Sequence, residues 1–204
     1  MMKLLRCADS GLLIELEDLD EVQSWYATLS ETPLEGVTAL VPAARTILVQ
    51  LDPERADVTA VQRAIRELTP RQAQRTSSEL VTVPVVYDGA DLRDVAELTG
   101  LTEREVVRYH TGAEWTVAFG GFAPGFGYLT GGPPELTVPR RAESRTKVPR
   151  GAVGLAGQFS GIYPRESPGG WQLIGRTELE IWCVDREPPA LLRPGVRVRF
   201  QEVG

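Results

Sequence analysis

The sequence of 204 residues is short of the side chains that carry many kinds of chemistry, with one histidine and two cysteines. Cys7 and Cys183 lie far apart and outside any Cys-x-x-Cys spacing, so we expect reduced thiols rather than a disulfide framework. No apolar run approaches the ~18 residues that a membrane span requires. The apolar stretch at the N-terminus is too short for a signal peptide. These absences predict a soluble, cytoplasmic protein that contacts no membrane.

Three further classes of function find little support in the sequence. The histidine, cysteine and carboxylate side chains show no metal-ligand spacing, so we expect no metal site. No Gly-x-Ser-x-Gly elbow marks a serine hydrolase. A formal net charge of -6 argues against a general nucleic-acid binder.

Imidazole chemistry, if present, must use His110, because the chain has no other histidine. This residue is expected in the last turn of a helix, where the helix dipole and the free carbonyl groups favour a cation. A structural role in capping or packing and a catalytic role in proton transfer therefore both stay open.

Glycine, in contrast, is abundant and concentrated in one region. Fourteen of the 20 glycines lie between Gly112 and Gly175. Glycine is used where backbone turns tightly or approaches a neighbour closely. Residues 112–177 also carry 7 basic and 4 acidic side chains in a chain that is acidic as a whole. The combination favours a cleft for a small anion such as a carboxylate or phosphate. The alternative is a solvated surface on which arginines pair with neighbouring acids.

The N-terminal part of the chain alternates strand and helix signals. Residues 3–7 and 12–16 are predicted strands around an Asp-Ser-Gly turn, and residues 36–41 and 46–51 a predicted hairpin. Apolar residues at helical spacing predict one helix from about residue 19 and a second over about residues 57–68. The expected fold of this part is a small α+β sandwich with two helices on an antiparallel sheet.

A polar segment, residues 69–79, lacks apolar periodicity and is predicted to be a linker. It separates an N-terminal domain, residues 1–76, from a C-terminal domain, residues 77–204. The second domain is expected to open with a strand over residues 80–87. Because proline cannot donate to a neighbouring strand, Pro84 predicts an edge position for this strand.

Two short helices are expected next, at about residues 92–98 and 103–110, the second with the capping box Thr102-Glu103-Arg104-Glu105. From Trp115 onward, short strands and turns predict a barrel or sandwich. The chain is predicted to close with a hairpin of residues 179–184 and 196–203.

The most distinctive segment is Ser167-Pro168-Gly169-Gly170-Trp171-Gln172-Leu173-Ile174-Gly175-Arg176-Thr177. Its second half nearly matches the phosphate-binding Gly-x4-Gly-Lys-Ser/Thr loop, with arginine in place of lysine. That loop follows a strand and opens a helix, whereas this segment is itself strand-like. The phosphate-loop interpretation is therefore rejected.

A second segment, Gly120 to Leu129, places three aromatic residues on backbone bent by glycine and proline. Such rings could wall a pocket, or could pin a loop to the core. Arginines at positions 140, 141 and 150 suit bidentate contacts with a carboxylate or phosphate. Gln158, Tyr163 and Gln172 could add neutral hydrogen bonds.

The order of these elements resembles the family that includes the B subunit of bacterial 5-oxoprolinase, allophanate hydrolase subunit 1 and the inhibitor of the sporulation histidine kinase. The resemblance includes His110 and the Ser167–Thr177 segment. The other matching motifs are Val83-Pro84-Val85-Val86-Tyr87-Asp88, Gly121-Phe122-Ala123-Pro124-Gly125-Phe126-Gly127-Tyr128-Leu129, Pro139-Arg140-Arg141, Val148 to Gln158 and Gly161-Ile162-Tyr163-Pro164. Ala123 and Gly127 stand where bulkier residues or proline are expected, which could reshape a pocket.

The resemblance implies an α+β fold: a small N-terminal α+β domain followed by a cyclophilin-like β-barrel. It also implies that the chain acts in a complex with two companions: a C-type carboxyltransferase-like subunit and an A-type subunit. In a 5-oxoprolinase, such a complex uses ATP to open the lactam of 5-oxoproline to L-glutamate.

The candidate site residues follow from the motifs. For the chemistry we select cationic or titratable groups that could surround a developing anion: His110, Arg140, Arg150 and Arg176. For substrate binding we select Phe122, Pro124, Phe126, Tyr128, Gln158, Tyr163, Ser167, Gly169, Gly170, Trp171 and Gln172.

Other functions stay open. The chain could instead bind a sensor histidine kinase and block its autophosphorylation, with a proline-containing segment of the kinase in the same cleft. An allophanate hydrolase or urea carboxylase role would depend on another chain to carry biotin. A prolyl isomerase rests on barrel analogy alone, and a fold does not determine function.

Overall fold

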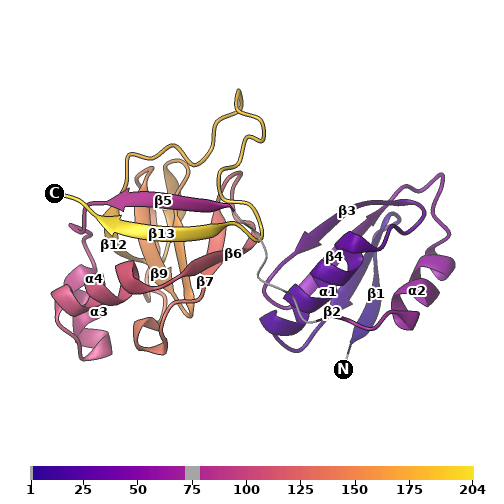
Figure 1. The fold of residues 1–204 in the computed structure, drawn as a ribbon, viewed down its shortest axis with the longest axis horizontal. Helices are drawn as coiled ribbons and strands as arrows, with labels where there is room; N and C mark the ends of the chain where they lie inside the picture. Colours follow the sequence, from indigo (N-terminus) through magenta and orange to yellow (C-terminus); the bar gives the residue numbers. More distant parts are fainter. Residues whose placement is uncertain (1, 72–78) are drawn as a thin grey trace. The chain divides into compact units, whose positions relative to one another are not determined.

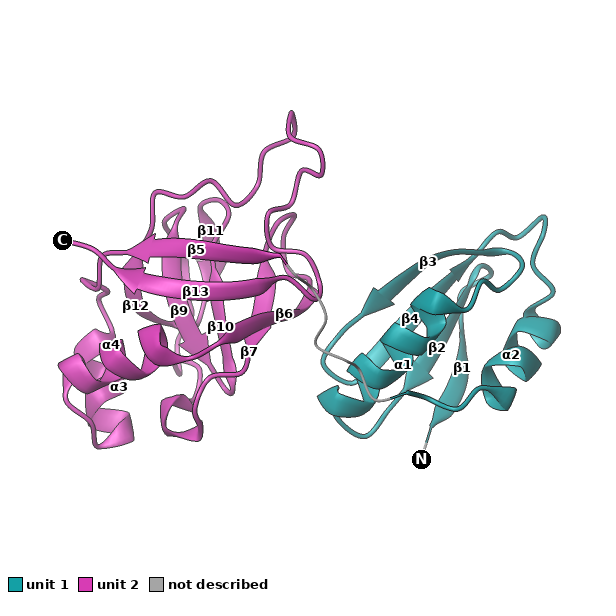
Figure 2. Cartoon of the chain, viewed as in Figure 1, with its two compact units in different colours: residues 1–75 teal, residues 76–204 magenta. Residues whose placement is uncertain are grey.

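A computed structural model describes residues 2–71 and 79–204 of the chain. Figure 2 distinguishes two compact units, Met1–Arg75 and Thr76–Gly204. The predicted domain boundary between residues 76 and 77, and most of the predicted linker, lie outside the described residues. Each unit is described by itself.

The N-terminal unit is a four-stranded antiparallel sheet with two helices, as the sequence predicts (Figure 1). One apolar cluster joins sheet and helices, and it includes the buried side chains of Ile14, Trp25 and Ile65. Asp18 and Asp57 begin the helices by accepting hydrogen bonds from backbone N–H groups of the first turn. In the strand order β1-β2-β4-β3, the elements are β1 (Lys3–Cys7), β2 (Gly11–Glu15), β4 (Thr46–Leu51) and β3 (Val37–Pro42), with α1 (Leu19–Glu31) and α2 (Val58–Glu67).

The C-terminal unit is built on a seven-stranded sheet that curls into a nearly closed barrel (Figure 1). Beyond the end of β5, Val86 and Arg176 exchange two backbone hydrogen bonds of 2.9 Å, which join the two edges of the sheet. Pro84 lies on β5, the last strand of the sheet order, so its predicted edge position is confirmed. In sheet order the strands are β12 (Gln172–Arg176), β9 (Ala152–Ala156), β10 (Phe159–Ile162), β7 (Gly127–Thr130), β6 (Trp115–Gly120), β13 (Arg197–Glu202) and β5 (Leu80–Val85).

Smaller elements complete this unit. A two-stranded ladder pairs β8 (Arg145–Val148) with β11 (Ser167–Gly169), and a short 3-10 helix spans Pro134–Leu136. Helix α3 (Leu92–Thr99) packs beside β12, and α4 (Glu103–Gly112) packs beside β13. The predicted capping box is confirmed, because Thr102 and Glu105 each accept a hydrogen bond from the other's backbone N–H. None of the helices in the described ranges is long and apolar enough to cross a bilayer.

The predicted closing hairpin is wrong. Residues 179–184 form no strand, and only an isolated bridge joins Trp182 to Ala190. Pro188 and Pro189 lack the backbone N–H groups that a strand ladder requires. Strand β13 pairs instead with β5 in parallel and with β6 in antiparallel orientation. The α+β class with a barrel is confirmed, while the likeness to cyclophilin stays a prediction.

Candidate ligand pocket

A pocket of about 290 Å³ opens on the C-terminal unit. Its walls come from four parts of the chain: the loop between β6 and β7 with the start of β7, the segment 139–145, the region after β10, and β11 with the residues that follow it. The lining residues are Phe122, Phe126, Tyr128, Arg140, Ser144, Tyr163, Pro168, Gly169 and Trp171.

Aromatic rings form the apolar wall of the pocket. Phe126 is buried and packs edge-on against Tyr128, Tyr163 and Trp171, with ring centroids 5.1, 5.4 and 5.3 Å apart. Edge-to-face contacts at this spacing are favourable and hold the rings in fixed orientations. Phe122 differs, because 57% of its surface is exposed and its φ is 62°, a left-handed conformation that bulky residues rarely adopt. Strained residues of this kind concentrate at binding sites.

Two glycines explain why the Pro-Gly-Gly turn fits here. A Cβ on Gly169 would lie 2.3 Å from the Tyr163 hydroxyl, and one on Gly170 would lie 2.8 Å from Ser144 Oγ. Both distances are shorter than Cβ contacts in real structures, so a larger residue would displace the packed Tyr163 ring at position 169 and the Ser144 hydroxyl at position 170. The turn thereby forms one side of the pocket.

The pocket carries one positive side chain and two neutral phenols. Burial raises the pKa of both Tyr128 and Tyr163, and the positive charge of Arg140 offsets part of that rise. Both hydroxyls are therefore protonated at neutral pH and can donate a hydrogen bond to a ligand. Arg140 itself is exposed at the pocket wall and can pair with an anion.

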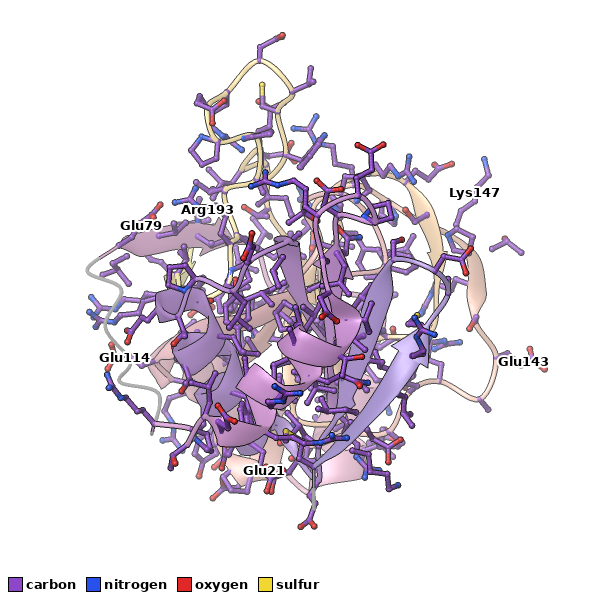
Figure 3. All side chains as sticks on the ribbon, turned by 90° about the vertical axis from the view of Figure 1, so that its right-hand side faces the viewer. Glu21, Glu79, Glu114, Glu143, Lys147 and Arg193 are labelled. Carbon is purple, nitrogen blue, oxygen red and sulfur yellow. The ribbon has the colours of Figure 1, made fainter. Side chains whose placement is uncertain are left out.

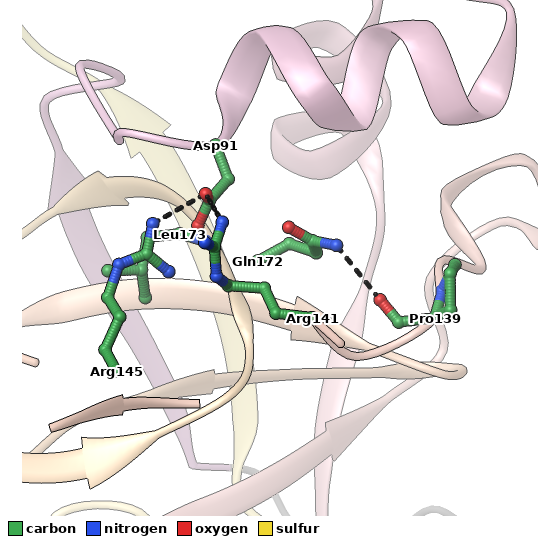
Figure 4. A network of polar contacts seen from close by, with 6 residues as sticks. All are labelled: Asp91, Pro139, Arg141, Arg145, Gln172 and Leu173. Carbon is green, nitrogen blue, oxygen red and sulfur yellow. Dashed lines mark hydrogen bonds and ion pairs between the residues drawn. The ribbon is translucent and has the colours of Figure 1, made fainter. Parts of the chain in front are cut away.

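Behind the segment 139–145 lies a buried carboxylate network (Figure 4). Asp91 is 1% exposed, and its Oδ1 accepts hydrogen bonds from Arg141 at 2.6 Å and from Arg145 at 2.7 Å. Its Oδ2 accepts a third from the backbone N–H of Leu173 at 2.7 Å. Burial raises the pKa of Asp91, but the hydrogen bonds from Arg145 and Leu173 and the two guanidinium charges outweigh burial and lower it below its ordinary value. One ionised carboxylate thus faces two guanidinium groups.

The pocket brings together seven of the residues that the sequence selects: Phe122, Phe126, Tyr128, Arg140, Tyr163, Gly169 and Trp171. Four others lie outside it. Pro124 and Gln158 are exposed, Ser167 donates to the backbone oxygen of Arg165, and Gln172 donates to that of Pro139. Gly170 only borders the pocket, beside Ser144 and Arg140.

The structure does not bring the three selected arginines together in the pocket. Arg176 stands at the far end of β12 from Trp171, and with a rise of about 3.3 Å per residue a strand of this length separates them by well over 10 Å. Arg176 pairs with Asp88 at 2.9 Å, and Arg150 pairs with Glu180 at 3.4 Å. Of the three, Arg140 alone lines the pocket. Gln172 directly follows Trp171, but it does not line the pocket, because its side-chain amide donates to the backbone oxygen of Pro139.

The structure also argues against a direct catalytic role for His110. The residue has no exposed surface and stacks on Phe200 with ring centroids 4.1 Å apart. Its Nδ1 lies 2.7 Å from the Tyr87 hydroxyl and its Nε2 lies 2.8 Å from Ser160 Oγ. Burial lowers the pKa of His110 to about 3, so the ring is neutral. The structural interpretation of this histidine holds, as a polar group satisfied within the barrel core.

Sequence reasoning missed three residues of the region. Ser144 and Pro168 line the pocket, and Pro168 could have been selected because it belongs to the Pro-Gly-Gly turn. Asp91 gave no signal beyond its place before a predicted helix, where an N-cap is expected. Its side chain makes no capping hydrogen bond and instead accepts hydrogen bonds from Arg141 and Arg145.

The C-terminal unit thus defines a class of protein: a small β-barrel with an aromatic pocket bordered by arginine. The particular family follows from comparison, since the chain belongs to the family described as carboxyltransferase domain, subdomain C and D, which matches residues 2–192. The resemblance seen in the sequence is confirmed.

Individual relatives agree with this assignment. The chain is 39% identical over 210 residues to the B subunit of 5-oxoprolinase from Escherichia coli O157:H7, with 98% of this chain and 96% of the relative covered. It is 34% identical over 216 residues to the protein of the same name from Bacillus subtilis (strain 168), with 96% and 90% covered. The solved structure of TTHA0988 is similar at a TM-score of 0.80 and 33% identity over 100% of this chain. The chain spans 41% of that longer protein.

Proposed function

We propose that this chain is the B subunit of a 5-oxoprolinase complex and that its pocket binds the lactam substrate. The observation that carries the substrate assignment is the pocket, which combines aromatic walls with Arg140 and Ser144. The likeness to two 5-oxoprolinase B subunits over nearly their full lengths supports the assignment to the complex.

The substrate is a small five-membered lactam that carries one carboxylate. Its ring is apolar on both faces and fits against the aromatic wall of Phe126 and Trp171. The guanidinium of Arg140 pairs with the carboxylate, and the hydroxyl of Ser144 supplies a further donor. The protonated hydroxyl of Tyr163 can donate to the lactam oxygen, which gains negative charge when the ring opens.

An unstrained lactam is a poor electrophile, and ATP supplies the activation that its opening requires. The described residues of this chain do not fit a nucleotide loop, because the segment that resembles one forms β12 and no helix follows it. We therefore assign ATP to the complex and its companion subunits. The role of this chain is to bind and orient the lactam and to shield it from water.

Reconstitution tests the assignment. The chain is purified with its companion subunits, and ATP-dependent release of glutamate from 5-oxoproline is measured with and without it. We expect activity to require this chain. Undiminished activity without it would contradict the proposal, and loss of sensor-kinase autophosphorylation on adding the chain alone would favour the regulatory alternative.

Arg140→Gln tests the pocket itself. A hydrogen bond to a charged group contributes about 1.5–3 kcal/mol, so the KM for 5-oxoproline should rise about 10- to 150-fold. The matched control is Arg93→Gln on α3, an arginine whose side chain is 80% exposed and outside the pocket. Equal KM values for the two variants would exclude Arg140 as the carboxylate partner.

A further inference from the structure

The pocket residues Arg140 and Ser144 lie on a segment that has no regular secondary structure of its own before β8 begins at Arg145. An exposed arginine on such a segment has many rotamers, and fixing it for a ligand costs conformational entropy. The structure shows how the segment is held. Its anchoring points alternate with the residues that face the pocket.

Four hydrogen bonds hold the segment. The backbone oxygen of Pro139 accepts a hydrogen bond from Gln172 at 3.2 Å. The backbone N–H of Arg141 donates to the oxygen of Gly170 at 2.8 Å. The side chains of Arg141 and Arg145 both turn inward to Asp91 (Figure 4). Glu143 and Lys147, in contrast, project from the surface (Figure 3).

Asp91 is also held by contacts that do not involve the arginines. Its backbone N–H donates to the oxygen of Leu173 at 2.9 Å, and its Oδ2 accepts from the N–H of Leu173 at 2.7 Å. These two bonds tie Asp91 to β12, the strand that Trp171 precedes. The carboxylate therefore connects the barrel wall to both ends of the stretch from Arg141 to Arg145.

The network also contributes charge. One carboxylate neutralises one of two guanidinium groups, which leaves a net positive charge behind the wall of the pocket. The charge of Arg145 acts on the Tyr163 phenol together with that of Arg140, so it is felt within the pocket. Such a field favours an anionic ligand.

We propose that Asp91 is a positioning residue: by binding Arg141 and Arg145 it anchors the segment 139–145 and holds Arg140 in place for the anionic group of the ligand. The identity of that ligand as 5-oxoproline rests on the proposed function above. The anchoring itself does not, and the two can fail separately.

Amide hydrogen exchange on the full chain tests the anchoring without any substrate. In Asp91→Asn the Arg141 amide, bonded to Gly170, should exchange at least about tenfold faster relative to core amides of the barrel, because the change replaces an ionic acceptor by a neutral one. The matched control is Asp88→Asn, which alters a half-exposed Asp–Arg pair elsewhere on the same barrel. Equal exchange of the Arg141 amide in both variants would overturn the proposal. If Asp91→Asn does not fold, Arg145→Gln removes one anchor and keeps Asp91 paired with Arg141.

A double-mutant cycle in the reconstituted complex tests the link to Arg140. Arg140 is expected to bind the substrate's carboxylate equally in the ground state and the transition state. Asp91→Asn should therefore raise the KM for 5-oxoproline about tenfold and change kcat little. In an Arg140→Gln background, Asp91→Asn should raise KM no further, because it acts through that arginine. Asp91→Glu, which keeps the charge, should restore part of the loss. Additive effects of the two substitutions would overturn the proposal. A normal KM in Arg140→Gln, with faster exchange in Asp91→Asn, would refute the lactam assignment and leave the anchoring established.

Discussion

His110 gives a sharp prediction, because its titration is separable from that of every other side chain. It is the single histidine, the side chain whose ordinary pKa lies between pH 5 and pH 8, so one substitution removes its whole contribution. In the folded chain its pKa is lowered by burial from 6.5 to about 3. The unfolded chain therefore binds a proton as the pH falls through 6.5, whereas the folded chain does not until about pH 3. Protonation favours the unfolded state, and stability falls as the pH falls from 7 to 5.

The size of this effect follows from the two pKa values. Below pH 6.5 the free energy of unfolding should fall by about 1.4 kcal/mol for each pH unit, which amounts to about 2 kcal/mol between pH 7 and pH 5. That is a large share of the 5–15 kcal/mol that stabilises a typical domain. Both ring nitrogens are bound, to Tyr87 and Ser160, so neither is free to take up a proton from water.

Urea unfolding at a series of pH values measures the slope. Tryptophan fluorescence reports on the C-terminal unit through Trp115, which lies 5.2 Å from His110 between ring centroids. The control is His110→Gln, which should be less stable at pH 7, and its stability should fall by about 2 kcal/mol less than that of the wild type between pH 7 and pH 5. A wild-type chain whose stability falls no more than that of this variant would refute the reasoning, because it would mean that the folded chain accepts a proton on His110.

Two further predictions concern a close packing contact and a helix cap. Gly169→Ala places a Cβ 2.3 Å from the Tyr163 hydroxyl, so it should lower the free energy of unfolding by about 1–3 kcal/mol. Adding Tyr163→Phe to this variant should recover part of that loss. Thermal unfolding measures both effects. Recovery by Tyr163→Phe is the deciding result, since strain from another neighbour would persist. Thr102→Ala removes the capping box of α4 and should lower the free energy of unfolding by about 1 kcal/mol. The control is Thr38→Ala, at an exposed position of β3, which should lower it by less. Equal losses of stability in urea unfolding would contradict the capping argument.

Most of the fold was predictable because its elements carry local signals. The helices show apolar residues at helical spacing, and α1, α2 and α4 have side-chain caps that the sequence displays. The hairpin of β3 and β4 and the edge position of β5 also follow from nearby residues. The closing hairpin failed because β13 finds its partners in β5 and β6, strands about 80 or more residues earlier. Strand pairing over such separations has no local signal.

The aromatic part of the pocket was predictable for a related reason. Phe122, Phe126 and Tyr128 lie within one short loop and strand, so a bend in the backbone is sufficient to bring their rings together. Trp171 and Gly169 belong to one turn that packs on that loop. The aromatic, glycine and proline residues of these two segments therefore predict from the sequence that the rings lie together.

The arginines were not predictable, because the direction of a side chain depends on partners that are distant in sequence. Arg140 and Arg141 are adjacent and chemically identical, yet one lines the pocket and the other binds Asp91, 50 residues earlier in the chain. A count of basic residues treats them alike. What distinguishes them is the buried carboxylate of Asp91, which accepts a hydrogen bond from Arg141, while Arg140 lines the pocket. The arginines of this region therefore have two roles: Arg140 faces the ligand, and Arg141 and Arg145 hold the segment that carries Arg140. The contact with Asp91 distinguishes the second role from the first.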